Sequence, residues 1–125
     1  MTILKNIKKL LGIDEEDDSF DTDLTILINS SFFKLSQIGI GPKSPFVITC
    51  DSTWDDFMKV PEECIESIKT YIFIQTKIIF DPPANSIVGE AYKSEIKELE
   101  FRLQLAVENE ELMMIGGDEN DDSIQ

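Results

Sequence analysis

Hydrophobic residues recur at helical spacing in the first third of the chain. Residues 2–11 place apolar side chains three and four positions apart, with lysines on the other face, and residues 24–38 repeat the pattern. Both stretches predict amphipathic helices. Gly12 and Gly39 are suited to end them, and Asp21 or Thr22 is suited to cap the second. The apolar positions are Ile3, Leu4, Ile7, Leu10 and Leu11, then Leu24, Leu27, Ile28, Phe32, Leu35 and Ile38.

Two longer helices are predicted in the second half. Residues 62–80 follow Pro61, which suits the first position of a helix, and stop before Asp81-Pro82-Pro83. The stretch is too long for a strand. Its apolar residues cover much of the helix circumference, which predicts a central helix. Asn85 or Ser86 can cap a last helix with a coiled-coil-like seam. The central stripes are Ile65, Ile68, Ile72 and Ile79 beside Tyr71, Ile74 and Ile78, and the seam is Tyr92, Ile96, Leu99, Leu103 and Ala106.

The segment between the two pairs of helices follows no helical pattern. Residues 39–58 begin with two glycines and two prolines, and residues 46–49 (FVIT) can form a short strand. Trp54 and Phe57 are large apolar groups in this polar loop. They either pack the loop onto the helices or contact a neighbouring chain, because tryptophan is enriched at interfaces.

These patterns predict an all-α fold, a small bundle of about four helices with an irregular loop between the second and third. We expect a helical domain over residues 1–111 and a flexible acidic segment over residues 112–125, released by Gly116-Gly117. Leu112, Met113, Met114 and Ile115 form an apolar patch at that junction. The patch either anchors the segment on a partner or completes the last helix on its own bundle.

Negative charge is concentrated in two short segments. The net charge is −14, and residues 14–23 and 108–125 each hold seven acids and no base. The remaining 11 acids balance the 11 lysines and arginines, so the central body is neutral. Affinity for DNA requires clustered bases, and the only candidates, Lys5, Lys8 and Lys9, lie close to the first acidic run. We therefore expect no phosphate-binding face.

The inventory of reactive side chains argues against catalysis. The chain has no histidine, and therefore lacks the commonest general base and metal ligand. Cys50 and Cys64 are expected to be reduced, packed thiols. We predict no catalytic residue, no metal and no cofactor. No apolar run is long enough to span a membrane, and residues 1–12 are not ordered as a signal peptide, which leads us to expect a soluble protein made in the cytoplasm.

Two other classes of function are compatible with parts of the sequence. Glu63 and Glu66 on one predicted helix, with Glu95 and Glu98 on another, are loosely spaced like the Mg²⁺ ligands of all-α nucleotide pyrophosphatases. Such pairs also arise by chance among 25 acids in 125 residues, and no phosphate-binding loop accompanies them. The second alternative is a small acidic inhibitor that mimics DNA, although here the acids fall in a loop and a tail.

The order of several short motifs resembles the head–tail connector (adaptor) proteins of siphophages and related prophages. An acidic loop leads into a helix ending QIGIGP (residues 37–42), followed by TWDDF (residues 53–57), a proline-started helix running into FDPP (residues 80–83), and a charged last helix. The resemblance covers residues 1–106. Each motif is short, and their order and spacing carry the likeness.

The resemblance implies a structural role without catalytic residues. It implies a virion protein of the head–tail interface, present in the host cytoplasm during assembly, that forms a homo-oligomeric ring of about twelve copies under the portal protein. The ring would extend the DNA channel and meet a downstream stopper or tail-completion protein, with DNA passing through without specific binding. Partner contacts would then fall on Trp54, Phe57, Leu112, Met113, Met114 and Ile115.

Overall fold

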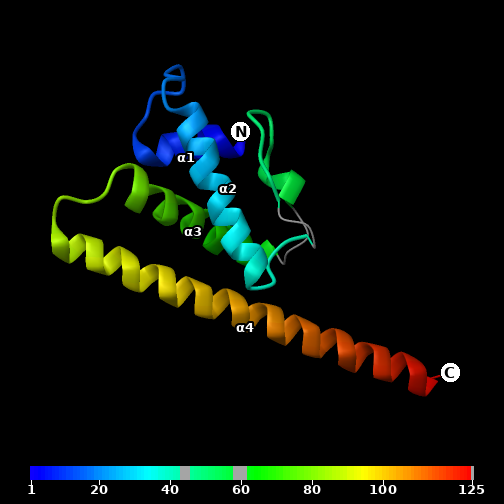
Figure 1. Ribbon diagram of the computed structural model, residues 1–125. Helices are drawn as coiled ribbons and strands as arrows, with labels where there is room; N and C mark the ends of the chain where they lie inside the picture. The colour runs from blue at the N-terminus through cyan, green and yellow to red at the C-terminus, as the bar shows by residue number, and fades with distance from the viewer. Residues whose placement is uncertain (43–45, 58–61, 125) are drawn as a thin grey trace.

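A computed structural model describes residues 1–42, 46–57 and 62–124 of the chain, with side chains for residues 1–42, 46–57 and 64–109. In these ranges the chain folds into four α-helices and one short 3₁₀ helix (Figure 1). The predicted all-α bundle is therefore confirmed. The elements are α1 (Ile3–Leu11), α2 (Asp21–Gln37), η1 (Trp54–Phe57), α3 (Glu62–Phe80) and α4 (Ser86–Ile124).

Helix α3 is the centre of the bundle, as its wide apolar surface predicts. It packs against α1, α2 and α4 (Figure 1), and Ile68, Tyr71 and Ile72 on it are fully buried. Ile79 continues the same stripe in the last turn but is exposed, so the stripe extends past the surfaces that cover it. Pro61, the predicted first residue of this helix, lies outside the described residues.

Helices α1 and α2 bury most of their predicted stripes against α3, but Leu10 of the α1 stripe is 47% exposed, so its predicted place on the buried face is wrong. Ile3, Leu4 and Ile7 of α1 are buried, as are Leu24, Ile28, Phe32 and Leu35 of α2. Gly12 ends α1 with a φ of 79°, a left-handed conformation that glycine adopts without strain. The N-cap of α2, however, is Phe20, so the predicted cap at Asp21 or Thr22 is wrong.

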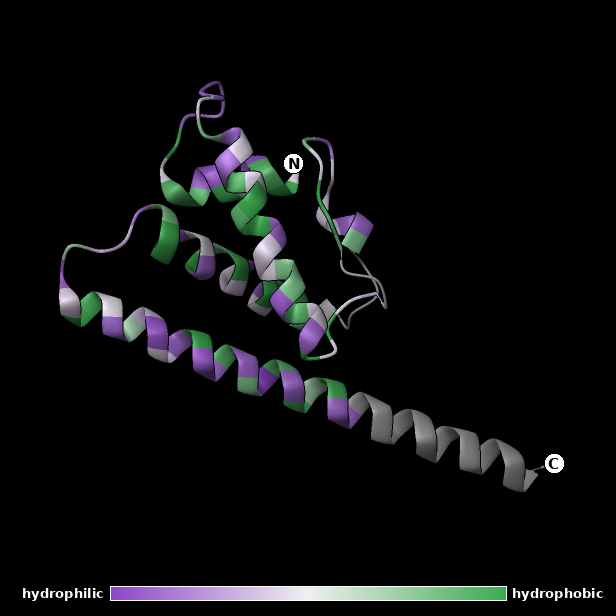
Figure 2. Cartoon of the chain, in the orientation of Figure 1, coloured by the Kyte–Doolittle hydropathy of each residue, from purple (hydrophilic) through white to green (hydrophobic). Residues whose placement is uncertain are grey.

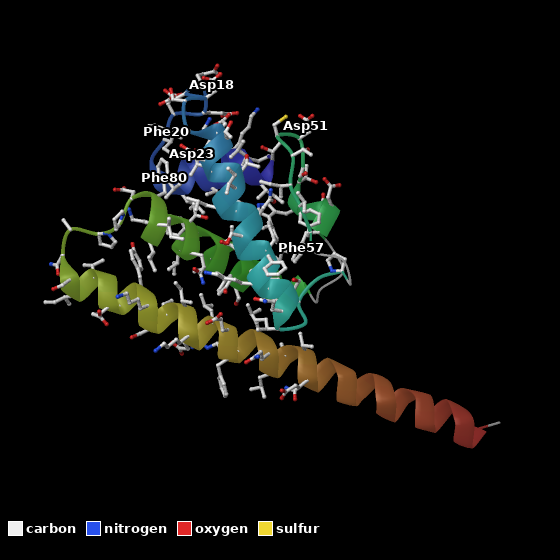
Figure 3. The ribbon with its side chains drawn as sticks, viewed as in Figure 1. Asp18, Phe20, Asp23, Asp51, Phe57 and Phe80 are labelled. Carbon is white, nitrogen blue, oxygen red and sulfur yellow. The ribbon has the colours of Figure 1, made fainter. Side chains whose placement is uncertain are left out.

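The start of α2 is held by side-chain contacts in place of a cap. The carboxylate Oδ1 of Asp21 lies 2.9 Å from Nζ of Lys8, which is only 2% exposed. The Phe20 ring packs edge-on against Phe80 at the end of α3, with ring centroids 5.2 Å apart (Figure 3). Because Asp21 is engaged by Lys8, its carboxylate is directed toward α1.

The acidic loop between α1 and α2 is largely exposed and is shaped by local hydrogen bonds. Asp14 accepts from the backbone amide of Glu16, and Asp17 accepts from that of Ser19. Hydrogen bonds from the side chain and the backbone of Ser19 hold the pKa of Asp17 below its usual value. The buried Lys8 donates to the carbonyl oxygen of Glu15 at 3.1 Å, which fastens the loop to α1.

Residues 46–49 form no strand; the short strand proposed from their sequence is wrong. The only bridge within the described ranges pairs Thr2 with Thr53. The backbone amide of Ile48 donates to the side chain of Asn29 on α2 at 2.7 Å, where a strand would pair with backbone. The segment is therefore anchored on a helix and lacks the neighbouring strand that a sheet requires.

An aromatic cluster closes this loop over α2. The Phe32 ring lies 5.0 Å from Phe46 and 4.8 Å from Phe57, centroid to centroid. Gly41, at a φ of 96°, passes so close that a Cβ there would lie 2.7 Å from Cε2 of Phe57. This glycine is therefore required both for its backbone conformation and for the approach of the loop to the ring.

Helix α4 begins at its predicted cap, since Asn85 accepts from the backbone amide of Ile87 at 2.8 Å. Ile96, Leu99 and Leu103 of its seam are buried, as predicted. Hydrophobic and hydrophilic residues alternate along its described part (Figure 2). The helix continues to Ile124 and so includes residues 112–115 and Gly116-Gly117, which were expected to lie beyond it. The division into a domain at residues 1–111 and a flexible segment at 112–125 stays a prediction.

The two cysteines lie in different environments. Cys64, at the start of α3, is buried. Cys50, in the turn that follows residues 46–49, is exposed. Packing was expected for both, and for Cys50 that expectation is wrong.

Candidate assembly surfaces

Phe57, the first of the two loop aromatics considered for partner contacts, lies inside the subunit. Phe57, which is labelled in Figure 3, is 1% exposed and packs against both Phe32 and Phe46. A side chain buried in this way stabilises the loop and offers almost no surface to another chain.

Trp54 is half-buried at the opposite end of η1. Its indole Nε1 donates to Oδ1 of Asn6 on α1 at 3.1 Å, and Nζ of Lys69 lies 5.6 Å from its ring centroid. The tryptophan thus joins η1 to α1 and α3 while keeping part of its ring in solvent. A shallow cavity of about 350 Å³ adjoins it, lined by Met1, Asn6, Thr53, Trp54, Asp55 and Lys69.

Leu112, Met113, Met114 and Ile115 were the other expected partner contacts. Their backbone belongs to α4, and their side chains lie outside the described residues. A role for them in partner binding stays a prediction.

Helix α4 carries a second apolar surface opposite its buried seam. Phe101 is 64% exposed and Leu105 is 44% exposed. At 100° per residue, both lie on the face opposite Leu99 and Leu103. We call Phe101 and Leu105 the outer face of α4.

Helix α2 is built in the same way. Ile26 is 62% exposed and Phe33 is 50% exposed, and the helical repeat sets them opposite Leu24, Ile28 and Leu35. We call Ile26 and Phe33 the outer face of α2. The sequence carried a signal for both outer faces, because these residues are apolar positions left over from the main stripes.

A chain of hydrogen bonds fixes α2, α3 and α4 relative to one another. Nζ of Lys34 on α2 donates to Gln75, whose amide donates to the Tyr71 hydroxyl at 3.1 Å. That hydroxyl donates to Oε2 of Glu100 on α4 at 3.0 Å. Burial, more than any other cause, raises the pKa of Tyr71. The network holds the helices that carry the two outer faces in a fixed arrangement.

Two of the four carboxylates considered as metal ligands, Glu66 and Glu98, form ion pairs with basic residues. Glu66 pairs with Lys69 at 3.4 Å, and Glu98 pairs with Arg102 one turn along α4. The side chain of Glu63 lies outside the described residues. In the part of the chain with described side chains, no three acidic or thiol groups gather closely enough to hold a metal ion.

The fold is thus a helical bundle with exposed apolar residues on two helices and a net charge of −14. Comparison with known families gives a match over residues 3–110 to the model described as phage connector protein. The chain belongs to the phage connector protein family. The match covers most of the chain, including all of α1, α2 and α3 and the part of α4 up to residue 110, and it confirms the resemblance drawn from the motifs.

Membership in the phage connector family gives this protein a structural role in the virion. It also implies contacts with other components of phage assembly. No curated protein and no solved structure matches the chain. Across the described residues, no helix combines the length and the apolar character needed to cross a bilayer.

Proposed function

We propose that this phage connector protein forms a ring of about twelve copies under the portal protein, where it extends the DNA channel and joins the head to the tail. A downstream stopper or tail-completion protein would bind the far side of the ring. The protein would be present in the host cytoplasm during assembly and at the head–tail interface in the finished particle. The observation that carries this proposal is the family match over residues 3–110.

The exposed apolar surfaces support a role in assembly. A ring of identical subunits needs two different surfaces on each copy, one for each neighbour. The outer faces of α2 and α4 are two such surfaces, carried by different helices. Large exposed side chains on two helices indicate that the bundle does not bury all its apolar surface alone.

The charge supports passage of DNA without binding. A net charge of −14 repels phosphates, and a channel lined with like charge offers DNA no contacts that would hold it. Asp18 of the exposed loop and Asp23 in the first turn of α2 (Figure 3) are candidates for this repulsion.

The proposal is tested by mixing the purified chain with the portal protein of the same phage. We expect a complex in light scattering, and electron micrographs in which a second ring lies on the portal ring. A chain that stays monomeric and leaves the portal unbound would contradict the proposal. Gel shifts with duplex DNA at physiological salt should show no binding, and micromolar affinity would contradict the channel argument.

A further inference from the structure

Helix α2 exposes no charged residue along the side that it turns to solvent. Between positions 26 and 37 its exposed residues are Ile26, Ser30, Phe33 and Gln37. At 100° per residue these four lie within about 60° of one another, so they share one side of the helix. Lys34, the one charged residue of this stretch, is only partly exposed and donates to Gln75 on α3 at 3.3 Å inside the subunit.

The loop beside α2 extends this uncharged surface. The backbone amide of Ile48 donates to Asn29 of α2, and Cys50 lines the same shallow cavity of about 280 Å³ as Ile26. The loop and α2 therefore run side by side (Figure 1). Val47, Thr49 and Cys50 are the exposed residues of the loop between positions 46 and 50. We define the neutral patch as Ile26, Ser30, Phe33, Gln37, Val47, Thr49 and Cys50.

The neutral patch differs from the other exposed apolar surface of the subunit. On α4, four exposed charged residues lie within four positions of Phe101 or Leu105; they are Lys97, Glu98, Arg102 and Glu108. Around the neutral patch, exposed acids lie at one end only, at Asp23 and Asp51 (Figure 3). The patch is thus an apolar surface free of charged side chains in a chain of which 29% is charged.

The absence of charge indicates which partner the patch fits. A basic partner would be attracted by carboxylates, so a surface that binds one would carry them. A second copy has the same net charge of −14, and acids on both contacting surfaces would repel one another. From this we infer that the neutral patch is the surface on which a second copy of this chain docks, through apolar contacts without ion pairs.

The inference rests on the proposed ring and names one of its contacts. In a ring, the second copy meets the patch with a different surface, because pairing of one patch with another would stop at a dimer. The three largest exposed side chains of the patch, Ile26, Phe33 and Val47, are 62%, 50% and 65% exposed in the single subunit and would be covered by the neighbour.

A single carboxylate added to the patch tests the inference. Ser30 is exposed between Ile26 and Phe33, and Ser30→Glu adds a charge there, whereas Ser30→Gln adds a side chain of the same size without one. Glutamate and glutamine favour a helix more than serine does, so the fold is retained, and circular dichroism checks this. We expect Ser30→Glu to weaken self-association about tenfold or more relative to Ser30→Gln, measured by light scattering.

Two controls belong with this comparison. Thr70→Glu adds the same charge at an exposed position of α3 outside the patch and should change self-association by less than about twofold. Raising the salt concentration should leave wild-type self-association as strong or make it stronger, because salt screens the repulsion between acidic chains and the contact contains no ion pair. Loss of association at high salt would overturn the inference.

The thiol of Cys50 reports on the same contact in the unmodified chain. Cys50 is exposed and Cys64 is buried, so a maleimide should label the free chain at Cys50. In rings, formed alone or on the portal, labelling should be several-fold slower, and unchanged labelling would contradict docking at the patch. A bismaleimide that joined Cys50 to Cys50 would show two-fold pairing and overturn the head-to-tail contact.

The outcomes separate the inference from the proposed function. If Ser30→Glu forms rings as readily as Ser30→Gln, the inference falls and the ring proposal stands. If Ser30→Glu lowers the affinity of the first copy for the portal and leaves the cooperativity of loading unchanged, the patch binds the portal and the inference is overturned. A wild-type chain that forms no oligomer, alone or on the portal, would overturn both.

Discussion

The hydroxyl of Tyr71 on α3 donates a hydrogen bond to the carboxylate of Glu100 on α4 at 3.0 Å. The same hydroxyl accepts from the amide of Gln75, which in turn accepts from Lys34 on α2. Tyr71 is fully buried, so this network satisfies a phenol that would otherwise be left without partners in the core. Because hydrogen bonds are directional, the network also restricts the position of α4 relative to α3 more than apolar packing alone would.

Replacing Tyr71 with phenylalanine should therefore destabilise the bundle. The ring remains, but Glu100 and Gln75 each lose a partner, and we expect a loss of about 1–2 kcal/mol in the free energy of unfolding. Tyr92→Phe is the matched control, because the Tyr92 hydroxyl makes no hydrogen bond to any residue with a described side chain. Urea denaturation checks both variants, and equal stability of Tyr71→Phe and wild type would contradict the role of the network.

The same tyrosine should make stability fall at alkaline pH. Burial raises the pKa of Tyr71 above its ordinary value of 10.0, so the folded protein keeps the phenolic proton after the unfolded chain has begun to release it. The stability from this group is complete below pH 10 and is lost as the pH rises above it, by up to about 1.4 kcal/mol per pH unit.

Comparing wild type with Tyr71→Phe between pH 9 and pH 11 isolates the contribution of the tyrosine. Above pH 10, the wild-type free energy of unfolding should decrease more steeply than that of the variant. Parallel curves would mean that the Tyr71 hydroxyl titrates alike in the folded and unfolded chains.

Lys8 gives a second stability prediction. It is buried, pairs with Asp21 at 2.9 Å and donates to the carbonyl of Glu15, whereas the adjacent Lys9 is exposed. Lys8→Met should cost about 1–3 kcal/mol, because it leaves a partly buried carboxylate and a loop carbonyl without their cation. Lys9→Met should change stability by less than about 0.5 kcal/mol. Thermal denaturation measures both, and a tolerated loss of Lys8 would show that the loop does not depend on it.

The sequence predicts the helices and the residues they bury, but not the contacts between side chains of different helices. The repeats around Ile28, Ile68 and Leu99 select one face of each helix, because a 3.6-residue period and burial are directly linked. The link from Tyr71 to Glu100 spans 29 residues, and no local pattern encodes which helix will lie opposite.

Lys8 illustrates why a charge pattern is a weaker guide than an apolar one. Lysine at a helix surface is ordinarily solvated, and its burial depends on the acidic loop folding back over α1. The folding of the loop over α1 also explains why the predicted N-cap of α2 is wrong, since it brings the carboxylate of Asp21 into contact with Lys8. For the assembly surfaces, apolar residues outside the main helical stripes indicated that the subunit needs neighbours. The sequence alone could not tell which large apolar residues are exposed, and only the structure shows that Phe57 is buried and Phe101 is exposed.

The C-terminal segment should contribute to docking and not to the fold. Among the side chains that the structure describes, which run to residue 109, the last buried one of the core is Leu103, and the family match ends at residue 110. We therefore expect removal of residues 112–125 to leave the free energy of unfolding unchanged. Binding to the portal protein should weaken, because the segment holds four consecutive apolar residues before its acidic end. Urea denaturation and a portal-binding titration measure the two effects separately.

Two narrower variants assign that effect within the segment. Serine at positions 112–115 removes the apolar residues and keeps the acids, whereas deletion of residues 116–125 removes the acidic end alone. We expect the serine variant to weaken portal binding as much as the full deletion, and the shorter deletion to have the smaller effect, since burying apolar side chains stabilises a contact more than exposed charges do. If the full deletion unfolds the protein, residues 112–115 complete the bundle and do not serve as an anchor.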